Sequence, residues 1–138
     1  MLSRKSVEKM IQEAILAIPE PIRRRLGNVA VVVEDRCRAG EDCDGGYWGE
    51  NDLLGLFEGV AMIDEGIETS GLLPAKITIF TSAIEEEAET PDEIPKIVRE
   101  TVWHEIAHYV GFDEAETLRL EEKWEKGFAG RKFDQDRG

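Results

Sequence analysis

Hydrophobic residues recur at intervals of three and four near the start of the chain, which predicts an amphipathic helix over residues 3–18. Pro19 and Pro21 end that pattern, and residues 21–26 are expected to add a short helical turn that Gly27 terminates. The apolar face of the first helix consists of Val7, Met10, Ile11, Ala14, Ile15 and Ile18.

Three short runs of β-branched and large apolar residues predict strands. Residues 29–33 are an unbroken run of valine and alanine, which is typical of a buried strand. Residues 77–80 predict a second strand, and residues 53–60 predict a third, in which a glycine would mark a bulge or a close approach of another backbone. Residues 35–52 are expected to form a long loop, and the acidic residues 84–93 a solvated loop.

The clearest helix signal lies in the second half of the chain. Thr90-Pro91-Asp92-Glu93 has the composition of a capping box, with threonine at the N-cap and proline at the first helical position. Apolar residues continue from there until Gly111, which predicts the C-terminal end of the helix. A further helix is expected to begin at Asp113 or Glu114 and to give way to a polar, frayed tail at about Gly127.

Length and charge restrict the classes of protein to which the chain can belong. Its 138 residues predict a single domain spanning residues 1–138. A net charge of −13, from 30 acidic and 17 basic residues, argues against binding to nucleic acids or anionic membranes. No apolar run approaches the roughly 18–20 residues of a membrane span, and no signal-peptide pattern occurs, so a cytoplasmic location is expected. The oligomeric state is not predicted.

Two local patterns in the first half of the chain suggest ligand sites that the surrounding sequence does not support. The triplet Arg23-Arg24-Arg25 suggests a phosphate site, but a solvated helix end suits so acidic a chain better. Asp42-x-Asp44 resembles the start of a calcium loop, but Tyr47 and Leu53 replace the glycine and glutamate that the pattern requires.

Cys37 and Cys43 lie six residues apart in a glycine-rich segment. In a protein without a recognisable export signal we expect both thiols to be reduced, and a small local disulfide is the alternative. Two cysteines are too few for a structural zinc site of their own.

The predicted helix at residues 90–111 contains the motif His104-Glu105-Ile106-Ala107-His108. Residues four positions apart share one face of a helix, so the two imidazoles can bind one Zn²⁺ ion. Glu105 projects about 100° around the helix axis from His104, which places its carboxylate beside the metal as a candidate general base. The neighbouring residues are apolar. Burial of His104, Glu105 and His108 among them would cost on the order of several kcal/mol unless the three side chains are paired or bound to a metal.

A catalytic zinc ion usually has three protein ligands, and the chain has no third histidine. Gly111 can reverse the chain after the helix, as in the motif H-E-x-x-H-x-x-G-x-x-H, whose last ligand position is occupied here by Glu114. We therefore prefer Glu114 as the third ligand, with Asp113 second, although Asp113 also suits the N-cap of the next helix. More distant alternatives are Glu121, Glu122 and Glu125.

These features resemble the small bacterial zincin-like metallopeptidases, which are described as a minimal metalloprotease fold. The resemblance covers about residues 50–125 and rests on three segments, Leu54–Gly59, Ile77–Phe80 and His104–Gly111. It implies an α+β domain in which the motif helix packs on a small mixed sheet, here with helices at both ends of the chain. It also implies a zinc site completed by an acid after the glycine, often aspartate, where this sequence has Glu114. No methionine follows the motif, so the methionine turn of metzincins is absent.

The motif and the resemblance together predict a zinc-dependent peptidase that acts on a peptide or protein substrate, with Glu105 as the general base. The alternative is a non-catalytic metal-binding or partner-binding domain that keeps the scaffold. In zincins an edge strand above the motif helix pairs with extended substrate, and residues 54–59 or 77–80 are candidates, each with a plain core strand as the alternative. Tyr47 is a candidate donor to an oxyanion, whereas Tyr109 is expected to pack away from the metal face.

Overall fold

The computed structural model describes residues 3–37, 46–50, 52–58 and 75–137, and for residues 129–137 it describes the backbone only. No helix within these ranges is both long and apolar enough to cross a membrane. The elements are α1 (Arg4–Ala17), α2 (Glu20–Leu26), β1 (Val29–Glu34), β2 (Tyr47–Trp48), β3 (Leu53–Glu58), β4 (Ala75–Phe80), α3 (Thr81–Glu87), a 3-10 turn (Pro91–Glu93), α4 (Ile94–Tyr109) and α5 (Glu114–Arg137).

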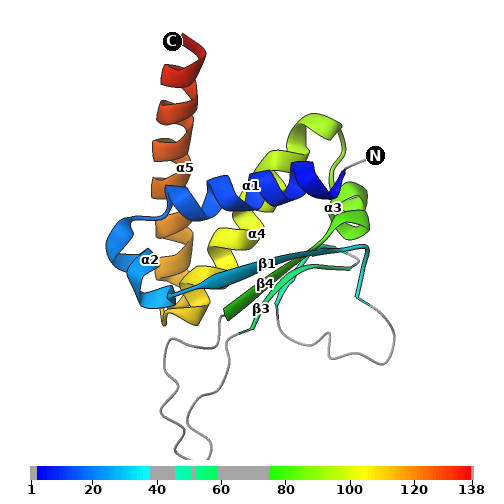
Figure 1. The fold of residues 1–138 in the computed structure, drawn as a ribbon, viewed down its shortest axis with the longest axis horizontal. Coiled ribbons are helices and arrows are strands. Elements are labelled where there is room, and N and C mark those ends of the chain that lie inside the picture. Colours follow the sequence, from blue (N-terminus) through cyan, green and yellow to red (C-terminus); the bar gives the residue numbers. More distant parts are fainter. Residues whose placement is uncertain (1–2, 38–45, 51, 59–74, 138) are drawn as a thin grey trace, which may run out of the picture.

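The four strands form one mixed sheet in the order β1–β4–β3–β2. Figure 1 shows the first three of them side by side. β1 pairs with β4 in parallel, and the other two pairings are antiparallel. Ile77 of β4 lies opposite Val31 of β1 and Phe57 of β3, so these three side chains share one face of the sheet. α1 contacts β1, and α4 contacts β2 and β3. The α+β class and the small mixed sheet against the motif helix are therefore confirmed.

The core lies between the sheet and the pair of helices α1 and α4. Val7 and Ile11 on the predicted apolar face of α1 are fully buried, as is Trp103 of α4. The indole N–H of Trp103 donates a hydrogen bond to the carbonyl oxygen of Ala14 at 2.8 Å. Because the buried indole N–H has a partner, Trp103 packs α4 against α1 without leaving an unsatisfied hydrogen-bond donor.

Gly55 of β3 is the strand glycine that allows the sheet to approach the motif helix closely. A Cβ atom at this position would lie 2.4 Å from Cγ2 of Thr101 in α4 and 3.0 Å from Cδ1 of Ile79. Gly55 therefore marks a close approach, but the two nearest atoms belong to side chains rather than to another backbone as predicted. The second glycine of the predicted strand, Gly59, lies outside the described residues.

We expect Gly55→Ala to lower the free energy of unfolding by about 1–3 kcal/mol, because the added methyl group overpacks the contact between β3 and α4. Gly127→Ala in α5 is the matched control, because a Cβ there meets nothing within 4 Å. It is expected to stabilise the protein by about 0.5–1 kcal/mol through helix propensity. Urea denaturation measures both changes, and effects of the same sign would contradict the close-packing explanation.

The central position of β4 corrects one of the two candidates for a substrate-binding edge. β4 lies between β1 and β3, so residues 77–80 form a core strand rather than an edge. β3 pairs with β2 only through Leu53 and Gly55. Within the described part of the chain, the side of β3 facing away from β4 therefore has no strand partner from Leu56 to Glu58. Residues 54–59, the other candidate for a substrate-binding edge, include this stretch without a strand partner.

Residues 84–93 are only in part the solvated loop that their acidic composition predicts, because residues 84–87 belong to a helix and 91–93 to a 3-10 turn. The helix α3 begins before them, at Thr81, and carries Ala83 and Ile84 into the core. Glu86 stays at the surface, where its carboxylate forms an ion pair with Arg36 at 2.8 Å. Two buried apolar side chains thus determine the structure of a segment whose glutamates remain solvated.

The motif helix begins three residues later than the capping box predicts. Residues Pro91–Glu93 form a 3-10 turn, and the side chain of Thr90 makes no capping hydrogen bond. α4 itself starts at Ile94 and carries Pro95 in its first turn. A proline is tolerated there because the first N–H groups of a helix have no partner within the helix.

The C-terminal helix is longer than the sequence pattern predicts. It spans Glu114–Arg137 and continues past Gly127, where we expected a frayed tail. The guanidinium of Arg99 in α4 makes two hydrogen bonds with the carboxylate of Glu125, at 3.1 and 2.7 Å. It also lies 4.2 Å from the ring centroid of Phe128. These contacts between α4 and α5 extend the packing into a stretch whose sequence is largely polar.

Cys37 is disulfide-bonded, which corrects the expectation of a reduced pair. The only other cysteine of the chain is Cys43, which lies outside the described residues together with Asp42 and Asp44 of the calcium-like pattern. Our expectation considered only the cellular compartment. A spacing of six residues in a glycine-rich segment is also compatible with the separation of about 4.4–6.8 Å between Cα atoms that a disulfide requires.

The three arginines of α2 make contacts within the protein. Nε of Arg23 donates to the carbonyl oxygen of Ile18 at 2.7 Å, and Arg24 forms an exposed ion pair within α2. Arg25 donates to the carbonyl oxygen of Val110 at 2.9 Å. This last contact holds the C-terminal end of the motif helix, where cationic groups are favourable.

Candidate metal centre

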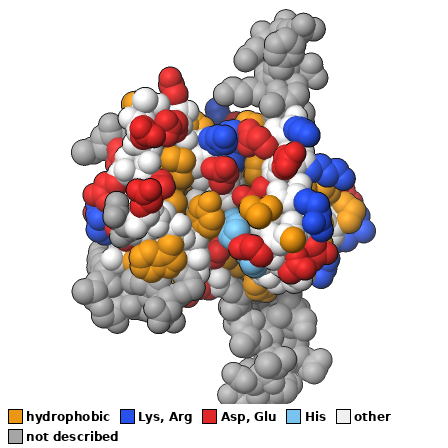
Figure 2. Space-filling view, turned by 180° about the vertical axis from the view of Figure 1, so that it is seen from behind, with side chains coloured by type: hydrophobic (Ala, Val, Ile, Leu, Met, Phe, Trp, Pro, Cys, Tyr) orange, Lys and Arg blue, Asp and Glu red, His pale blue; other side chains and the backbone are white. Residues whose placement is uncertain are grey.

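His104 and His108 lie one turn apart on α4, as their spacing predicts, and their Nε2 atoms are 3.1 Å apart. The ring centroids are separated by 4.6 Å. Figure 2 shows histidine side chains at the surface of the molecule, with acidic and hydrophobic side chains around them. Two imidazole nitrogens that face each other at this distance are well placed to share a cation.

A tight turn after α4 returns the chain towards these histidines. Gly111 has φ of +105°, a conformation that residues with a side chain rarely adopt. The N–H groups of Gly111 and Phe112 donate to the carbonyl oxygens of His108 and Ala107, at 3.1 and 3.0 Å. These bonds close the end of the helix, so that α5 begins at Glu114 directly beside the histidines.

Glu114 is the acid that the turn brings to the two imidazoles. Its Oε1 atom lies 3.0 Å from Nε2 of His108 and 3.3 Å from Nε2 of His104. With the distance of 3.1 Å between the nitrogens, the three atoms form a nearly equilateral triangle. Ligands of a tetrahedral zinc ion, about 2.0–2.1 Å from the metal, lie about 3.3–3.4 Å from one another. Two imidazoles and one carboxylate at these separations therefore fit zinc.

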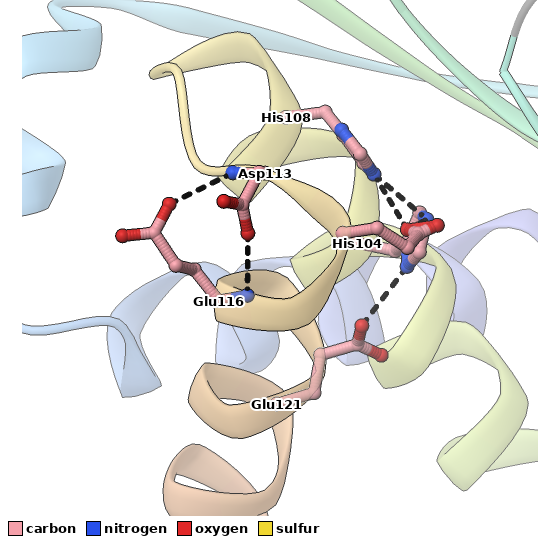
Figure 3. A network of polar contacts seen from close by, with 6 residues as sticks. His104, His108, Asp113, Glu116 and Glu121 are labelled. Carbon is pink, nitrogen blue, oxygen red and sulfur yellow. Dashed lines mark hydrogen bonds and ion pairs between the residues drawn. The ribbon is translucent and has the colours of Figure 1, made fainter.

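Asp113, the second candidate for the third ligand, has a different place in the structure. Its carboxylate accepts a hydrogen bond from the N–H of Glu116 at 2.8 Å, and its own N–H donates to the carboxylate of Glu116 at 3.0 Å. This reciprocal pair is a capping box at the start of α5. Figure 3 shows both side chains on the far side of the turn from the histidines.

Glu121 lies about two turns into α5 and contacts the other nitrogen of His104. Its Oε2 atom is 2.9 Å from Nδ1, and both side chains are mostly buried (Figure 3). Because the carboxylate accepts, Nδ1 carries the proton, and the lone pair of Nε2 is left available to a metal ion that Glu114 and His108 would also bind. The hydrogen bond to Glu121 raises the pKa of His104, and burial opposes it. The more distant ligand candidates Glu122 and Glu125 pair with Lys126 and Arg99.

We expect Glu121→Ala to weaken zinc binding about 10–100-fold, the usual cost of losing a group that orients a metal ligand. Competition with a chelator of known affinity measures the change. Glu122→Ala is the matched control, because the neighbouring carboxylate is largely exposed and pairs only weakly with Lys126 at 3.6 Å. Equal affinities of the wild type and Glu121→Ala would show that this carboxylate does not position His104.

Glu105 lies beside the triangle of donor atoms rather than within it. Its side chain is nearly buried, with 9% of the residue exposed, and its Oε1 accepts the N–H of Phe57 at 3.0 Å. Burial raises the pKa of Glu105, while the Phe57 N–H and the two histidines act in the opposite direction. A raised pKa brings a carboxylate closer to neutral pH, where a general base is most effective.

The candidate metal-binding group, His104, His108 and Glu114, opens into a cavity of about 490 Å³. Part of the wall comes from Gly46, which directly precedes β2 and has φ of +80°; a Cβ there would lie 2.6 Å from the carbonyl oxygen of Gly55. The cavity is lined by Gly46, Phe57, His104, Glu105, His108, Tyr109 and Glu114. The structure thus gathers the candidate base, the two histidines and Glu114 around one open space.

The structure places both tyrosines beside the candidate site, where the proposed donor role of Tyr47 stays a prediction and the expected position of Tyr109 is corrected. Tyr47 packs its ring against His104, with 4.7 Å between the ring centroids, and it is not among the residues that line the cavity. Burial and nearby carboxylates, first among them Glu100, raise the pKa of Tyr47 to about 12. Tyr109 was expected to pack away from the metal face, but it lines the cavity beside Phe57.

Comparisons with known proteins agree with this architecture. A family model described as zincin-like metallopeptidase matches residues 26–124, which include the described sheet and the whole motif helix. A solved structure of a conserved hypothetical protein from Thermus thermophilus is similar in fold, with a TM-score of 0.53 and 22% identity. That similarity covers 78% of this chain and 94% of the other. No curated protein matches. Because the family match covers well over half of its length, the chain belongs to the zincin-like metallopeptidase family.

Proposed function

We propose that this protein is a zinc-dependent peptidase that hydrolyses peptide bonds in a peptide or protein substrate. The observation that carries the proposal is the nearly buried Glu105 beside a group of three metal-binding atoms in an open cavity. Structural zinc sites are closed by four protein ligands, whereas catalytic sites use three and keep one position open. A buried carboxylate beside such a position is suited to proton transfer.

Each residue of the site has a defined part in the proposed reaction. Zinc held by His104, His108 and Glu114 would supply Lewis acidity, which polarises the scissile carbonyl group and lowers the pKa of water. Glu105 accepts a proton from the attacking water and passes it to the nitrogen of the leaving amine as the C–N bond breaks. The N–H of Phe57 fixes the position of this carboxylate through its hydrogen bond of 3.0 Å.

The open stretch of β3 is the surface on which we propose that substrate binds as an additional strand. Leu56–Glu58 has no strand partner on its outer side within the described residues. The same stretch carries Phe57, which contacts Glu105 through its backbone. A peptide paired with this edge would therefore run past the base and the metal-binding group.

Removal of the metal by a chelator is expected to abolish hydrolysis of unstructured peptides, and addition of zinc is expected to restore it. The reason is that the described side chains lining the cavity supply a base but include no lysine or arginine that could polarise the carbonyl oxygen in place of the metal. Mass spectrometry of the peptide products measures the activity of the chelated and the reconstituted protein. Full activity after complete chelation would contradict the proposed reaction.

The alternative is a non-catalytic metal-binding or partner-binding domain that retains the zincin scaffold. In that case zinc would raise the thermal midpoint of the protein, and no peptide would be cleaved. The open cavity and the nearly buried Glu105 favour the peptidase, because a purely structural metal site needs neither feature. Measurement of the thermal midpoint alongside turnover separates the two functions.

The net charge of the chain bears on the substrate that we infer, and the disulfide bears on its location in the cell. The net charge of −13 supports a peptide or protein substrate rather than a nucleic acid or an anionic membrane. A cytoplasmic location stays a prediction, and the disulfide at Cys37 is a state more common in oxidising compartments.

A further inference from the structure

Two aromatic side chains lie against each other in the wall of the cavity. The ring centroids of Phe57 and Tyr109 are 4.5 Å apart, and the ring planes are tilted by 46°. Both residues line the cavity that contains the metal-binding group. They give an apolar surface to a site whose other side chains are imidazoles and carboxylates.

Tyr109 is unusually accessible for such a large side chain, with 46% of its surface exposed. In the described part of the chain, the other large hydrophobic residues with this degree of exposure are Leu16, Trp48 and Leu118. Of the four, only Tyr109 lines the cavity. Packing on Phe57 covers part of the ring, and the exposed 46% is available to a ligand in the cavity.

The backbone places the rings of Phe57 and Tyr109 close to the candidate base and to the metal-binding group. Tyr109 directly follows His108 in α4, and the N–H of Phe57 donates to the carboxylate of Glu105. An extended peptide advances about 3.3 Å per residue. A side chain that contacts this aromatic pair therefore belongs to a residue close to the bond that is cleaved.

We propose that Phe57 and Tyr109 form a subsite for an aromatic or large aliphatic side chain that flanks the scissile bond. This inference rests on the proposed peptidase function and specifies its substrate class. An apolar side chain loses contact with water when it packs on the two rings, and aromatic rings gain further from offset or edge-to-face contact. Because the cavity is open, we expect the preference over alanine or serine to lie near the low end of hydrophobic discrimination, about tenfold.

The first test is a profile of cleavage sites in a mixture of unstructured peptides, read by mass spectrometry. The wild type is expected to enrich aromatic or large aliphatic residues about tenfold on one side of the cleaved bond. Tyr109→Ser is expected to lose most of this enrichment and Tyr109→Phe to keep it. Leu16→Ser removes an even more exposed apolar side chain, which lies in α1 away from the cavity, and is the control that should change nothing. The zinc content of each variant is measured first, so that loss of preference is not confused with loss of metal.

The second test measures binding without turnover. Phenylalanine hydroxamate and alanine hydroxamate carry the same metal-chelating group and differ in one side chain. The zinc-loaded wild type is expected to bind the former about tenfold more tightly, and Tyr109→Ser to bind both equally. Should Tyr109→Ser fold poorly, Tyr109→Leu replaces it. This variant is expected to reduce the ratio of the affinity for phenylalanine hydroxamate to that for alanine hydroxamate.

The outcomes separate the subsite from the reaction. Cleavage without an apolar preference, or a preference unchanged in Tyr109→Ser, would overturn the subsite and leave the peptidase proposal standing. A zinc-loaded protein that cleaves no peptide would contradict the peptidase proposal, and the hydroxamate ratio then decides the subsite alone. A ratio near one in the wild type would overturn it.

Discussion

Glu105→Gln is expected to lower kcat/KM for an unstructured peptide by about 10²–10⁴-fold, the range that a general base contributes. The amide has the shape of the carboxylate, and its carbonyl oxygen can still accept the N–H of Phe57. It cannot take a proton from water. Steady-state kinetics with a single peptide, at fixed zinc concentration, measures the loss.

The same substitution is expected to leave the zinc content unchanged, because Glu105 is not among the three donor atoms. Glu86→Gln is the control, since this carboxylate lies on the surface of α3 and pairs with Arg36. Equal rates for the wild type and Glu105→Gln would exclude Glu105 as the base, whatever metal the site holds.

Substitution of Glu114 is expected to weaken zinc binding, whereas substitution of the adjacent Asp113 is expected to lower only the stability of the protein. Glu114→Ala should weaken zinc binding at least about a hundredfold, because loss of a ligand exceeds the 10–100-fold cost of losing an orienting group. Asp113→Ala should keep the affinity for zinc and lower the free energy of unfolding by about 0.5–2 kcal/mol, the cost of an N-cap. Chelator competition and urea denaturation on both variants measure the two quantities.

Asp113→Ser provides the matched control, because serine is also a good N-cap and should recover most of the lost stability. Retained zinc affinity in Glu114→Ala together with its loss in Asp113→Ala would assign the ligand to Asp113 instead. That result would also require the capping box with Glu116 to open when metal binds.

The parts of the site that the sequence predicts are those that depend on local geometry. The spacing of His104 and His108 places both on one helix face whatever surrounds them. Gly111 ends the helix and reverses the chain, which makes Asp113 and Glu114 the first acids to follow the histidines, with Glu121, Glu122 and Glu125 as more distant candidates. The structure adds what separates these two acids, namely the hydrogen bonds of Asp113 to Glu116.

Other features depend on contacts between distant segments and could not be inferred from spacing. The partner of His104 Nδ1 lies 17 residues away on another helix, where several glutamates follow one another. Tyr109 looks in sequence like a packing residue, and only the position of Phe57 on β3 places it in the cavity wall. The helix α3 was missed because two buried residues outweigh the acidic composition around them.

Every step of the proposed reaction requires that His104, His108 and Glu114 hold a single metal ion. Metal analysis of the purified protein, with His104→Ala prepared in parallel, tests this requirement directly. We expect one zinc ion per chain in the wild type and none above background in the variant. A folded wild type that takes up no zinc at micromolar concentrations, or a variant that keeps one zinc ion per chain, would contradict the proposed site.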